Sequence, residues 1–268
     1  MDIDVQNFTV ANLRRRPVVV QAGGFVAGFQ RDTTSPYLNY ATPVPGARPT
    51  GRDVASLIEA FRERGLKPRL EFVPDAAPAV EAALREAGFT TEAVHEYLVC
   101  TPATLAVPPV PPVPSVSSVS PAPSVTGASA LPVEVPATDE DYASIDAALS
   151  EAFDGEFVSS PEGAARLRHI QESGGAVRFV RAPGGGCAGG ACCSAPAVGT
   201  AELSGVGTRP AFRGRGIAVA VTAALTEVMF ARGADSVWLE YGGEGSRRVY
   251  ERVGYRPRGT RLYMALEG

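Results

Sequence analysis

The sequence predicts an α/β (α+β) protein of two domains, each a mixed, mostly antiparallel sheet flanked by helices. Three observations support this prediction. The chain has 268 residues, more than one average domain needs. A proline-rich stretch divides it, and the two flanking halves repeat one order of helices and strands. We therefore expect one domain at residues 1–100, a linker at 101–132 and a second domain at 133–268.

The dividing stretch, residues 101–132, reads TPATLAVPPVPPVPSVSSVSPAPSVTGASALP. Proline fixes φ and has no N–H, so this density of prolines is incompatible with a helix or a central strand and favours an extended polyproline-II conformation. The stretch is typical of a semi-rigid linker. A ligand for an SH3-type domain is the alternative, although no arginine or lysine accompanies the prolines.

The two halves resemble each other in their helix–strand units. A helix that ends in Arg-Gly and leads into a strand reads FRERGLKPRLEF at 61–72 and FARGADSVWLEY at 230–241. A second helix closes on a glycine and an aromatic residue, LREAGF at 84–89 and YERVGY at 250–255, with the glycine placed as a left-handed cap. A final strand follows in both halves. The pattern favours a duplicated unit, and chance similarity of generic units is the alternative.

Further elements are expected in the second half. Thr138 and Asp141 form a capping-box-like start for a helix. The predicted strands and helices, in chain order, are a strand at 132–138, helices at 139–153 and 161–172, strands at 176–182, 189–195 and 200–208, and a long helix from Gly216. With the two repeated units, the predicted order is β-α-α-β-β-β-α-β-α-β, with one parallel step near the long helix.

Composition excludes several classes of protein. The chain is 45% hydrophobic and 20% charged, with a formal net charge of −4, which argues against the broad basic surface of a nucleic-acid binder. No apolar run reaches the roughly 18 residues of a membrane helix. The first ten residues, MDIDVQNFTV, lack the pattern of a secretory signal. We expect a cytoplasmic protein, a monomer or homodimer, without nucleic-acid or membrane partners.

The cysteines and histidines do not indicate a metal site. Neighbouring Cys192 and Cys193 would point to opposite faces of a strand, which suits neither a simple disulfide nor a CxxC metal site. We interpret them as small residues that fill a strand, with a metal or redox role as the alternative. Two histidines, His95 and His169, lie far apart in the sequence, so we expect no metal and no serine–histidine triad.

The stretch TRPAFRGRGIAVAV, residues 208–221, has the features of an anion site. A strand leads into a turn, and apolar residues at helical spacing follow. Gly214 and Gly216 allow the backbone to approach a ligand closely, and the start of a helix adds free N–H donors and partial positive charge. Arg213 and Arg215 supply donors suited to phosphate oxygens. The turn is therefore predicted to bind a pyrophosphate.

Two other interpretations of this turn are open. Glycines before a helix can simply tighten a bend, with the arginines solvated. A dinucleotide-binding fold would also place Gly214-x-Gly216 after a strand, with Glu240 ending the next strand. Against it, Val219 stands where the third glycine belongs, and too little chain follows to complete a doubly wound sheet.

The residues Arg213-Gly214-Arg215-Gly216-Ile217-Ala218 match the [Q/R]-x-x-G-x-[G/A] motif of the GNAT acetyltransferase superfamily. The resemblance extends over AELSGVGTRPAFRGRGIA and RRVYERVGYRP, most of residues 131–268. It implies that this loop holds the pyrophosphate of acetyl-CoA. It also implies that the splayed strand before the loop binds the pantetheine arm through the backbone of Val206, Gly207 and Thr208.

The same resemblance suggests catalytic groups. Tyr250 falls on the family's tyrosine that protonates the departing thiolate, with packing in the core as the alternative. Glu202 falls where some members carry a glutamate that deprotonates the amine, directly or through water; a solvated strand glutamate is the alternative, and Glu240 is the reserve candidate. One departure is Gly243, which occupies the position of a frequent asparagine.

The first half lacks these features. The segment before its helix, PGARPTGRDV at 45–54, has no paired glycines, and Leu84 occupies the place of Tyr250. Residues 1–100 are therefore interpreted as a degenerate copy, in a tandem arrangement that resembles mycothiol synthase-like members without specifying their substrate.

The resemblance implies an N-acetyltransferase. It would move an acetyl group from acetyl-CoA to a primary amine, a small molecule or a peptide N-terminus, by direct attack in a ternary complex. A non-catalytic acyl-CoA-binding or scaffolding protein is the alternative, and a longer acyl donor such as succinyl-CoA stays open.

Overall fold

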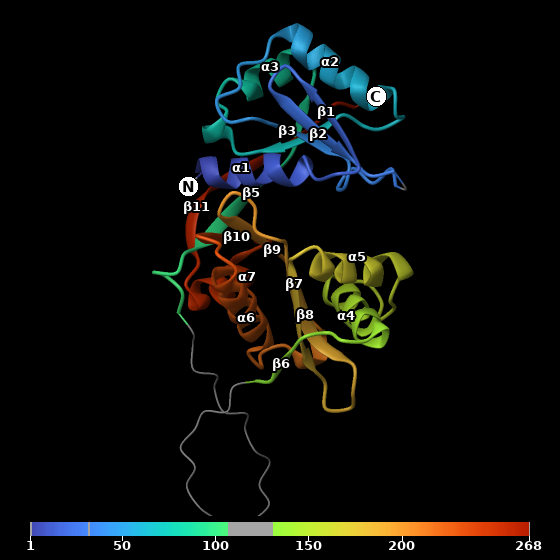
Figure 1. Cartoon of the computed structure of the whole chain (residues 1–268), viewed down its shortest axis with the longest axis vertical. Helices are drawn as coiled ribbons and strands as arrows, with labels where there is room; N and C mark the ends of the chain where they lie inside the picture. The colour runs from blue at the N-terminus through green and yellow to red at the C-terminus, as the bar shows by residue number, and fades with distance from the viewer. Residues whose placement is uncertain (1, 32, 107–130, 268) are drawn as a thin grey trace, which may run out of the picture.

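A computed structural model describes residues 2–31, 33–106 and 131–267. Its centre is one 11-stranded sheet with the order β1-β2-β3-β4-β11-β5-β10-β9-β8-β7-β6 (Figure 1). The strands are β1 (Val18–Ala22), β2 (Phe25–Phe29), β3 (Tyr40–Pro43), β4 (Arg69–Phe72), β5 (Thr90–Cys100), β6 (Val133–Glu134), β7 (Ala176–Arg181), β8 (Cys187–Cys193), β9 (Thr200–Thr208), β10 (Ser236–Glu240) and β11 (Arg256–Ala265). The helices are α1 (Asp2–Leu13), α2 (Gly51–Arg62), α3 (Val80–Glu86), α4 (Asp139–Ala152), α5 (Pro161–Glu172), α6 (Ile217–Ala231) and α7 (Glu244–Val253).

The predicted fold class is confirmed. The sheet is mixed and mostly antiparallel, with parallel pairing where β3 meets β4 and where β9 meets β10. The second half runs in the predicted order, from β6 through α4, α5, β7, β8, β9, α6, β10 and α7 to β11, and its parallel step is the one that α6 connects. The first strand is shorter than predicted, since β6 has only two residues.

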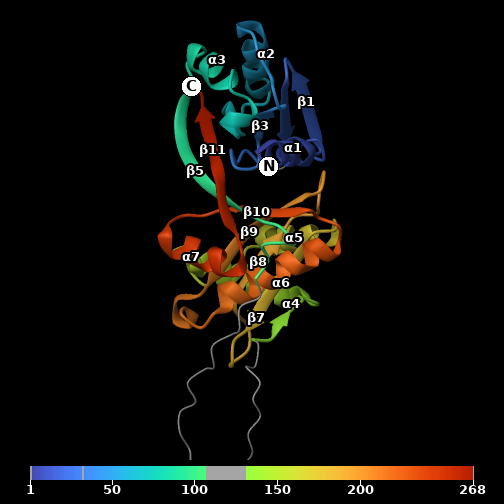
Figure 2. The ribbon, with the colours of Figure 1, turned by 90° about the vertical axis from the view of Figure 1, so that its left-hand side faces the viewer.

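The two halves exchange their last strands. β5, from the first half, pairs with β10 of the second half, and β11, from the second half, pairs with β4 of the first. Between them β5 and β11 form the longest antiparallel pairing of the sheet. Figure 2 shows these two strands running side by side from one unit to the other, and the C-terminus lies among the elements of the first half. The result is a continuous sheet where the sequence suggested two.

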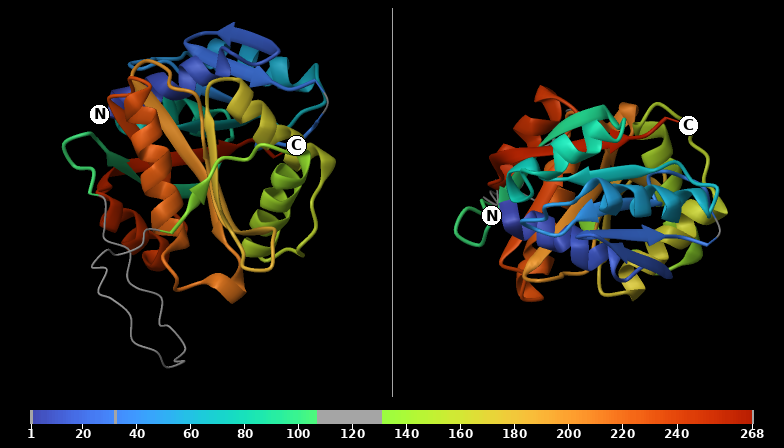
Figure 3. Two further views of the ribbon diagram at one scale, coloured as in Figure 1. Left: turned by 60° about the horizontal axis from the view of Figure 1, so that its bottom comes forward. Right: turned by 90° about the horizontal axis from the view of Figure 1, so that it is seen from above.

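Each half therefore completes its hydrophobic core with a strand of the other. Leu262 and Met264 of β11 are buried in the core of the first half, which α2 and α3 cover. Leu98 and Cys100 of β5 are buried in the core of the second half, beneath α6 and α7. Figure 3 shows α6 on one side of the second unit and α4 and α5 beside β7 and β8. Burial of apolar surface is the main favourable term in folding, so the exchange ties the stability of one half to that of the other.

Local sequence signals begin and end the helices as expected. The capping box of Thr138 and Asp141 forms at the start of α4. Main-chain N–H groups, that of Ala137 above all, together with Arg181, lower the pKa of the Asp141 carboxyl to about 2. Gly254 ends α7 with a φ of +105°, the left-handed conformation that glycine adopts without strain.

Most of the proline-rich stretch, residues 107–130, lies outside the described residues, so the linker prediction is untested there. Its first residues pack on the second half: Ala106 N–H donates to the carbonyl of Val253 at 2.9 Å. In the part of the chain that the structure describes, no helix is both long and apolar enough to span a membrane.

Candidate active site

The strand β9 separates from β10 halfway along its length. It pairs with β10 only from Thr200 to Glu202, whereas its pairing with β8 continues to Thr208. The pairing with β8 shifts register next to Gly205, whose φ is +62°, as in a β-bulge. On the β10 side, no described strand pairs with residues Val206 to Thr208. Their peptide groups can therefore bind an extended ligand there. This is the splayed strand that the resemblance implied.

The helix α6 starts at this opening without a side-chain cap. Its N-cap is Gly216, with a φ of +80°, and no side chain accepts from its first N–H groups. Gly214 has a φ of +75°, also in the left-handed region. The first N–H groups of a helix have no partner inside the helix, so those of Ile217 and Ala218 are available to an anion.

Two arginines beside this helix start have no carboxylate partner in the described chain. Arg213 donates to the carbonyls of Thr208 at 3.3 Å and Ala152 at 3.1 Å, and Arg215 donates to that of Ala211 at 3.2 Å. Their charges therefore remain uncompensated next to the free N–H groups, which is an arrangement suited to a pyrophosphate.

A third arginine of the turn, Arg209, is paired with a carboxylate. Arg209 forms an ion pair with Glu151 of α4 at 2.6 Å, and its guanidinium stacks on Phe157 at 3.8 Å. It ties the end of β9 to α4, so Arg213 and Arg215 are the arginines of the turn that have no carboxylate partner in the described chain.

Tyr250 of α7 belongs to the core of the second half and is 7% exposed. Its ring lies edge-on to Tyr255 with 6.2 Å between the centroids. Its hydroxyl forms no hydrogen bond with any described residue, in contrast to Tyr255, whose hydroxyl lies 2.7 Å from Thr226 Oγ1. Burial raises the pKa of Tyr250 to about 12, so the phenol stays protonated at neutral pH and keeps a proton to donate.

Glu202 is the carboxylate at the point where β9 and β10 part. Its side-chain oxygens form no hydrogen bond with the described residues. Burial raises the pKa of this carboxyl from 4.5 to about 7, and neighbouring charges act in both directions. Such a group is half deprotonated at neutral pH, as a general base should be.

Glu240, the second candidate for the general base, already has hydrogen-bond and ion-pair partners. Its carboxylate accepts from Arg261 at 2.7 Å and from the Tyr263 hydroxyl at 2.6 Å, and it lies 3.0 Å from His95 Nδ1. Burial raises its pKa, but Arg261 and the hydrogen bonds outweigh burial, and the net pKa lies below the usual range. A carboxylate held this way is a poor proton acceptor, so the structure favours Glu202 over Glu240.

Gly243 forms the N-cap of α7, and no side chain caps that helix. Among the described residues, the one side-chain hydrogen bond to it comes from the hydroxyl of Ser246, which donates to its carbonyl at 2.7 Å. The position of the frequent asparagine therefore offers main-chain groups only.

The corresponding helix start in the first half is closed. Thr50 caps α2, and the Asp53 carboxylate accepts from the Thr50 N–H at 2.7 Å, which completes a capping box. A negative carboxylate thus occupies the place where an anion would bind, and the turn at Gly23 packs directly on it. Leu84, in the place of Tyr250, is fully buried in an apolar core.

Sequence reasoning missed a group of charged residues between the halves. Glu71 of β4 and Arg261 of β11 are buried and lie 3.3 Å apart, and Arg261 also binds Glu240 of β10. The signal was present in the repeat, because Glu71 aligns with Glu240 in LEF and LEY and His95 aligns with Arg261. The exchange of strands, which brings them together, could not be read from the sequence.

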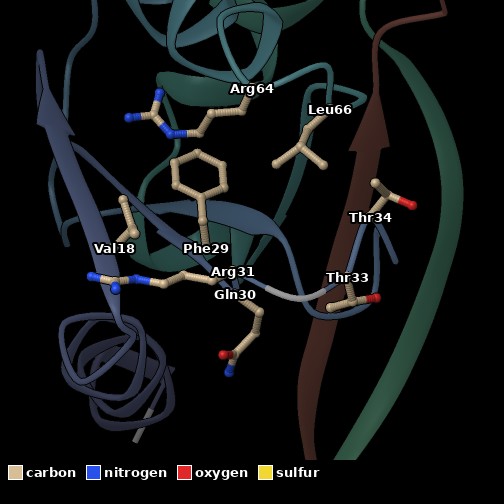
Figure 4. Close-up of a pocket in the computed structure, with 8 residues that line it drawn as sticks. All are labelled: Val18, Phe29, Gln30, Arg31, Thr33, Thr34, Arg64 and Leu66. Carbon is tan, nitrogen blue, oxygen red and sulfur yellow. The ribbon is translucent and has the colours of Figure 1, made fainter.

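Other features take no part in this site. The four cysteines are buried free thiols, and burial raises the pKa of Cys187 to about 12. No cluster of three His, Cys, Asp or Glu side chains able to hold a metal occurs within 2–31, 33–106 and 131–267. A cavity of about 820 Å³ lies in the first half, away from the opening of β9, with Phe29, Arg31 and Arg64 in its lining (Figure 4).

Comparisons with known proteins agree with this geometry. The acetyltransferase (GNAT) family model matches residues 143–255, from α4 to the end of α7. No curated protein sequence matches the chain.

Solved structures show the same fold. A GCN5-related N-acetyltransferase from Kribbella flavida is 24% identical, with a TM-score of 0.77 over 100% of this chain and 96% of that one. A GCN5-related N-acetyltransferase from Sphaerobacter thermophilus is 16% identical, with a TM-score of 0.57 over 90% and 76%. A tandem GNAT protein from the clavulanic acid biosynthesis pathway is 14% identical, with a TM-score of 0.60 over 99% and 87%. Residues 143–255 therefore match a domain of the acetyltransferase (GNAT) family.

Proposed function

We propose that the chain is an N-acetyltransferase that moves the acetyl group of acetyl-CoA to a primary amine by direct attack in a ternary complex. The observation that carries the proposal is the uncapped start of α6, flanked by Arg213 and Arg215, next to the open edge of β9. The same loop, from Arg213 through Gly214, Arg215 and Gly216 to Ile217 and Ala218, would bind the pyrophosphate. Val206, Gly207 and Thr208 would bind the pantetheine arm.

Glu202 and Tyr250 would each transfer one proton, Glu202 as the base and Tyr250 as the acid. Glu202 takes a proton from the ammonium form of the acceptor, so that the free amine attacks the thioester carbonyl carbon. The C–N bond forms, the C–S bond breaks, and Tyr250 donates its proton to the departing thiolate. The attacking nitrogen loses its second proton to solvent, and solvent returns a proton to Tyr250. A thiol has a pKa of about 8.5, so it leaves readily once a donor is near.

The first half is proposed to be a degenerate copy, with residues 1–100 and 133–268 as the duplicated domains and 101–132 as their linker. Support comes from the capping box that closes α2 and from Leu84 in place of a proton donor. Its role would be to complete the core of the second half and to contribute to acceptor selection. We place the protein in the cytoplasm as a monomer or homodimer, with an amine or peptide N-terminus as acceptor and no metal.

Turnover tests the proposal. Acetyl-CoA is incubated with the protein and a panel of amines, amino acids, aminoglycosides and peptides, and the released thiol is measured. Release that depends on an amine and is lost in Tyr250→Phe supports the transferase. Tight acetyl-CoA binding without thiol release across the panel would instead support a non-catalytic acyl-CoA-binding protein. The same assay with succinyl-CoA tests the acyl donor.

A further inference from the structure

A chain of ion pairs crosses from the first half to the second beside Glu202. Glu71 binds Arg261 at 3.3 Å, Arg261 binds Glu240 at 2.7 Å, and Glu240 lies 3.0 Å from His95. These residues come from β4, β11, β10 and β5, which are neighbours in the sheet. Arg261 is 3% exposed and Glu71 8%, so solvent screens their charges weakly.

Glu202 stands next to this chain. The parallel pairing of β9 with β10 sets Glu202 opposite Trp238, and the Arg261 guanidinium lies 5.0 Å from the Trp238 ring. Side chains two residues apart on a strand share a face, so Glu240 lies on the same face as Trp238. Arg261 therefore packs on Trp238, and Glu202 and Glu240 occupy neighbouring positions on the same face of the sheet.

Two N–H donors of the cluster are unpaired in the described chain. The Nε–H of Arg261 and the Nε1–H of Trp238 are buried and have no acceptor among the described residues. Arg261 thus shares one charge between carboxylates of the two halves and keeps an unused donor. A change at Glu71 therefore changes how far the charge of Arg261 is neutralised.

Charges from every side act on Glu202. Apart from burial, Arg261 of β11 and Arg16 after α1 favour its ionised form, while Glu240 of β10 and Glu71 of β4 oppose it. The charge of Glu202 also acts on Tyr40 of β3 and on the thiols Cys192 and Cys193 of β8, but burial raises the pKa of each of these three groups and keeps it neutral. The ion pair that joins the halves therefore contributes charges of both signs.

We propose that Glu71 and Arg261 are positioning residues: through the ion pair between β4 and β11, the first half sets the charge that Glu202 carries at neutral pH. The inference rests on the proposed role of Glu202 as the general base. It gives the first half a part in the reaction although that half has no open anion site of its own.

The test measures the midpoint of the Glu202 titration directly. Glutamate carboxyl carbons of the full-length protein are titrated by ¹³C NMR, and the Glu202 signal is assigned by its loss in Glu202→Gln. Glu71→Gln removes one negative charge and leaves Arg261 less neutralised, so the Glu202 midpoint should fall by about 0.5–1 pH unit. Glu71 also pairs with Arg69 of β4. In Glu71→Gln, Arg261 keeps Glu240 as a partner, and Arg69 keeps Glu92.

A matched control lies in the same half. Glu92 also binds Arg69, at 2.7 Å, but it is not among the charges that act most strongly on Glu202, so Glu92→Gln should leave the midpoint nearly unchanged. Glu240→Gln removes the other carboxylate bound to Arg261 and should also lower the midpoint, which tests the part of Arg261 if Glu71→Gln does not fold. An unchanged midpoint in folded Glu71→Gln, or an equal shift in Glu92→Gln, overturns the proposal.

The pH dependence of kcat/KM separates this inference from the proposed function. The acid limb should move with the NMR midpoint in Glu71→Gln, while the KM for acetyl-CoA stays the same. If the NMR midpoint moves and the acid limb does not, the coupling between the halves holds and the role of Glu202 as base fails. The NMR titration needs neither acetyl-CoA nor an acceptor.

Discussion

Arg261 lies directly opposite His95 where β11 pairs with β5, and the two residues occupy equivalent positions of the repeat. Antiparallel pairing of equivalent residues implies an approximate two-fold axis between these strands. The contacts around it agree: Glu240 lies 3.0 Å from His95, and the equivalent Glu71 lies 3.3 Å from Arg261. The duplicated units are thus related by symmetry through the strands that they exchange.

Because the two halves exchange strands, we expect them to assemble when they are produced as separate chains. Residues 1–106 and 131–268, co-expressed as two chains, should copurify as a one-to-one complex, because β5 and β11 each pair across the boundary. Residues 131–268 alone should not fold cooperatively, since the core beneath α6 lacks Leu98 and Cys100. Calorimetric unfolding checks both; a cooperative transition in the isolated second half contradicts the interdependence of the cores.

A pair of glycines tests the anion site. Gly216 and Gly233 flank α6 with φ of +80° and +84°, and both have room for a methyl group. Alanine at either position should cost roughly 1–2 kcal/mol of stability, because the left-handed region disfavours a Cβ. Only Gly216→Ala should also weaken acetyl-CoA binding, by at least about tenfold, since the free N–H groups then move. Equal affinities of the two variants for acetyl-CoA would show that acetyl-CoA does not bind at the start of α6.

The arginines allow a similar comparison. Arg213→Ala should weaken acetyl-CoA binding about tenfold or more and reduce its salt dependence, because a charge-assisted phosphate contact is lost. Arg232 also donates to main-chain carbonyls, those of Gly174 and Gly175, at the other end of α6. Arg232→Ala should leave binding unchanged in calorimetric titration, and a comparable loss in both variants would point to a general effect of charge.

Tyr250 and Tyr255 distinguish catalysis from packing. Tyr250→Phe should lower kcat by about 10²–10⁴-fold and keep the affinity for acetyl-CoA, because only the proton donor is removed. Tyr255→Phe breaks the hydrogen bond to Thr226, so it should lower the melting temperature more than the turnover. Full turnover in Tyr250→Phe with a good acceptor would assign Tyr250 to packing.

The raised pKa of Glu202 predicts a pH-dependent stability. Folding lifts this pKa from 4.5 to about 7, so the folded state binds more protons than the unfolded state between these values and loses stability as the pH rises. Glu202→Gln removes this cost, and the variant should be more stable than wild type by roughly 1–3 kcal/mol at pH 8 but not at pH 4. Glu240→Gln should show the opposite sign at pH 8, because the pKa of Glu240 is lowered. Thermal melts at both pH values check this, and equal melting temperatures of Glu202→Gln and wild type at pH 8 contradict it.

The local signals of the sequence predicted local structure well. The capping box at Thr138, the left-handed cap at Gly254 and the limits of α5 depend on a few neighbouring residues, and the structure has all three. The splay of β9 and the uncapped start of α6 follow from a short motif in the same way.

What the sequence could not predict depends on pairing between distant segments. The repeat indicated two copies of one unit, but nothing local distinguishes a β5 that folds back on β4 from one that pairs with β10, since the same apolar face is buried either way. The cluster of Glu71, Arg261 and Glu240 follows from that exchange. The sequence therefore could not decide whether Glu202 or Glu240 is free to accept a proton, because that depends on the hydrogen-bond and ion-pair partners of each carboxylate.

We propose that the second half of the chain binds acetyl-CoA at the start of α6 and that the first half does not. Calorimetric titration of acetyl-CoA into the full-length protein measures this stoichiometry. We expect one equivalent per chain, because Asp53 closes the start of α2 while Gly216 leaves that of α6 open. Two equivalents, or no binding at all, would contradict it.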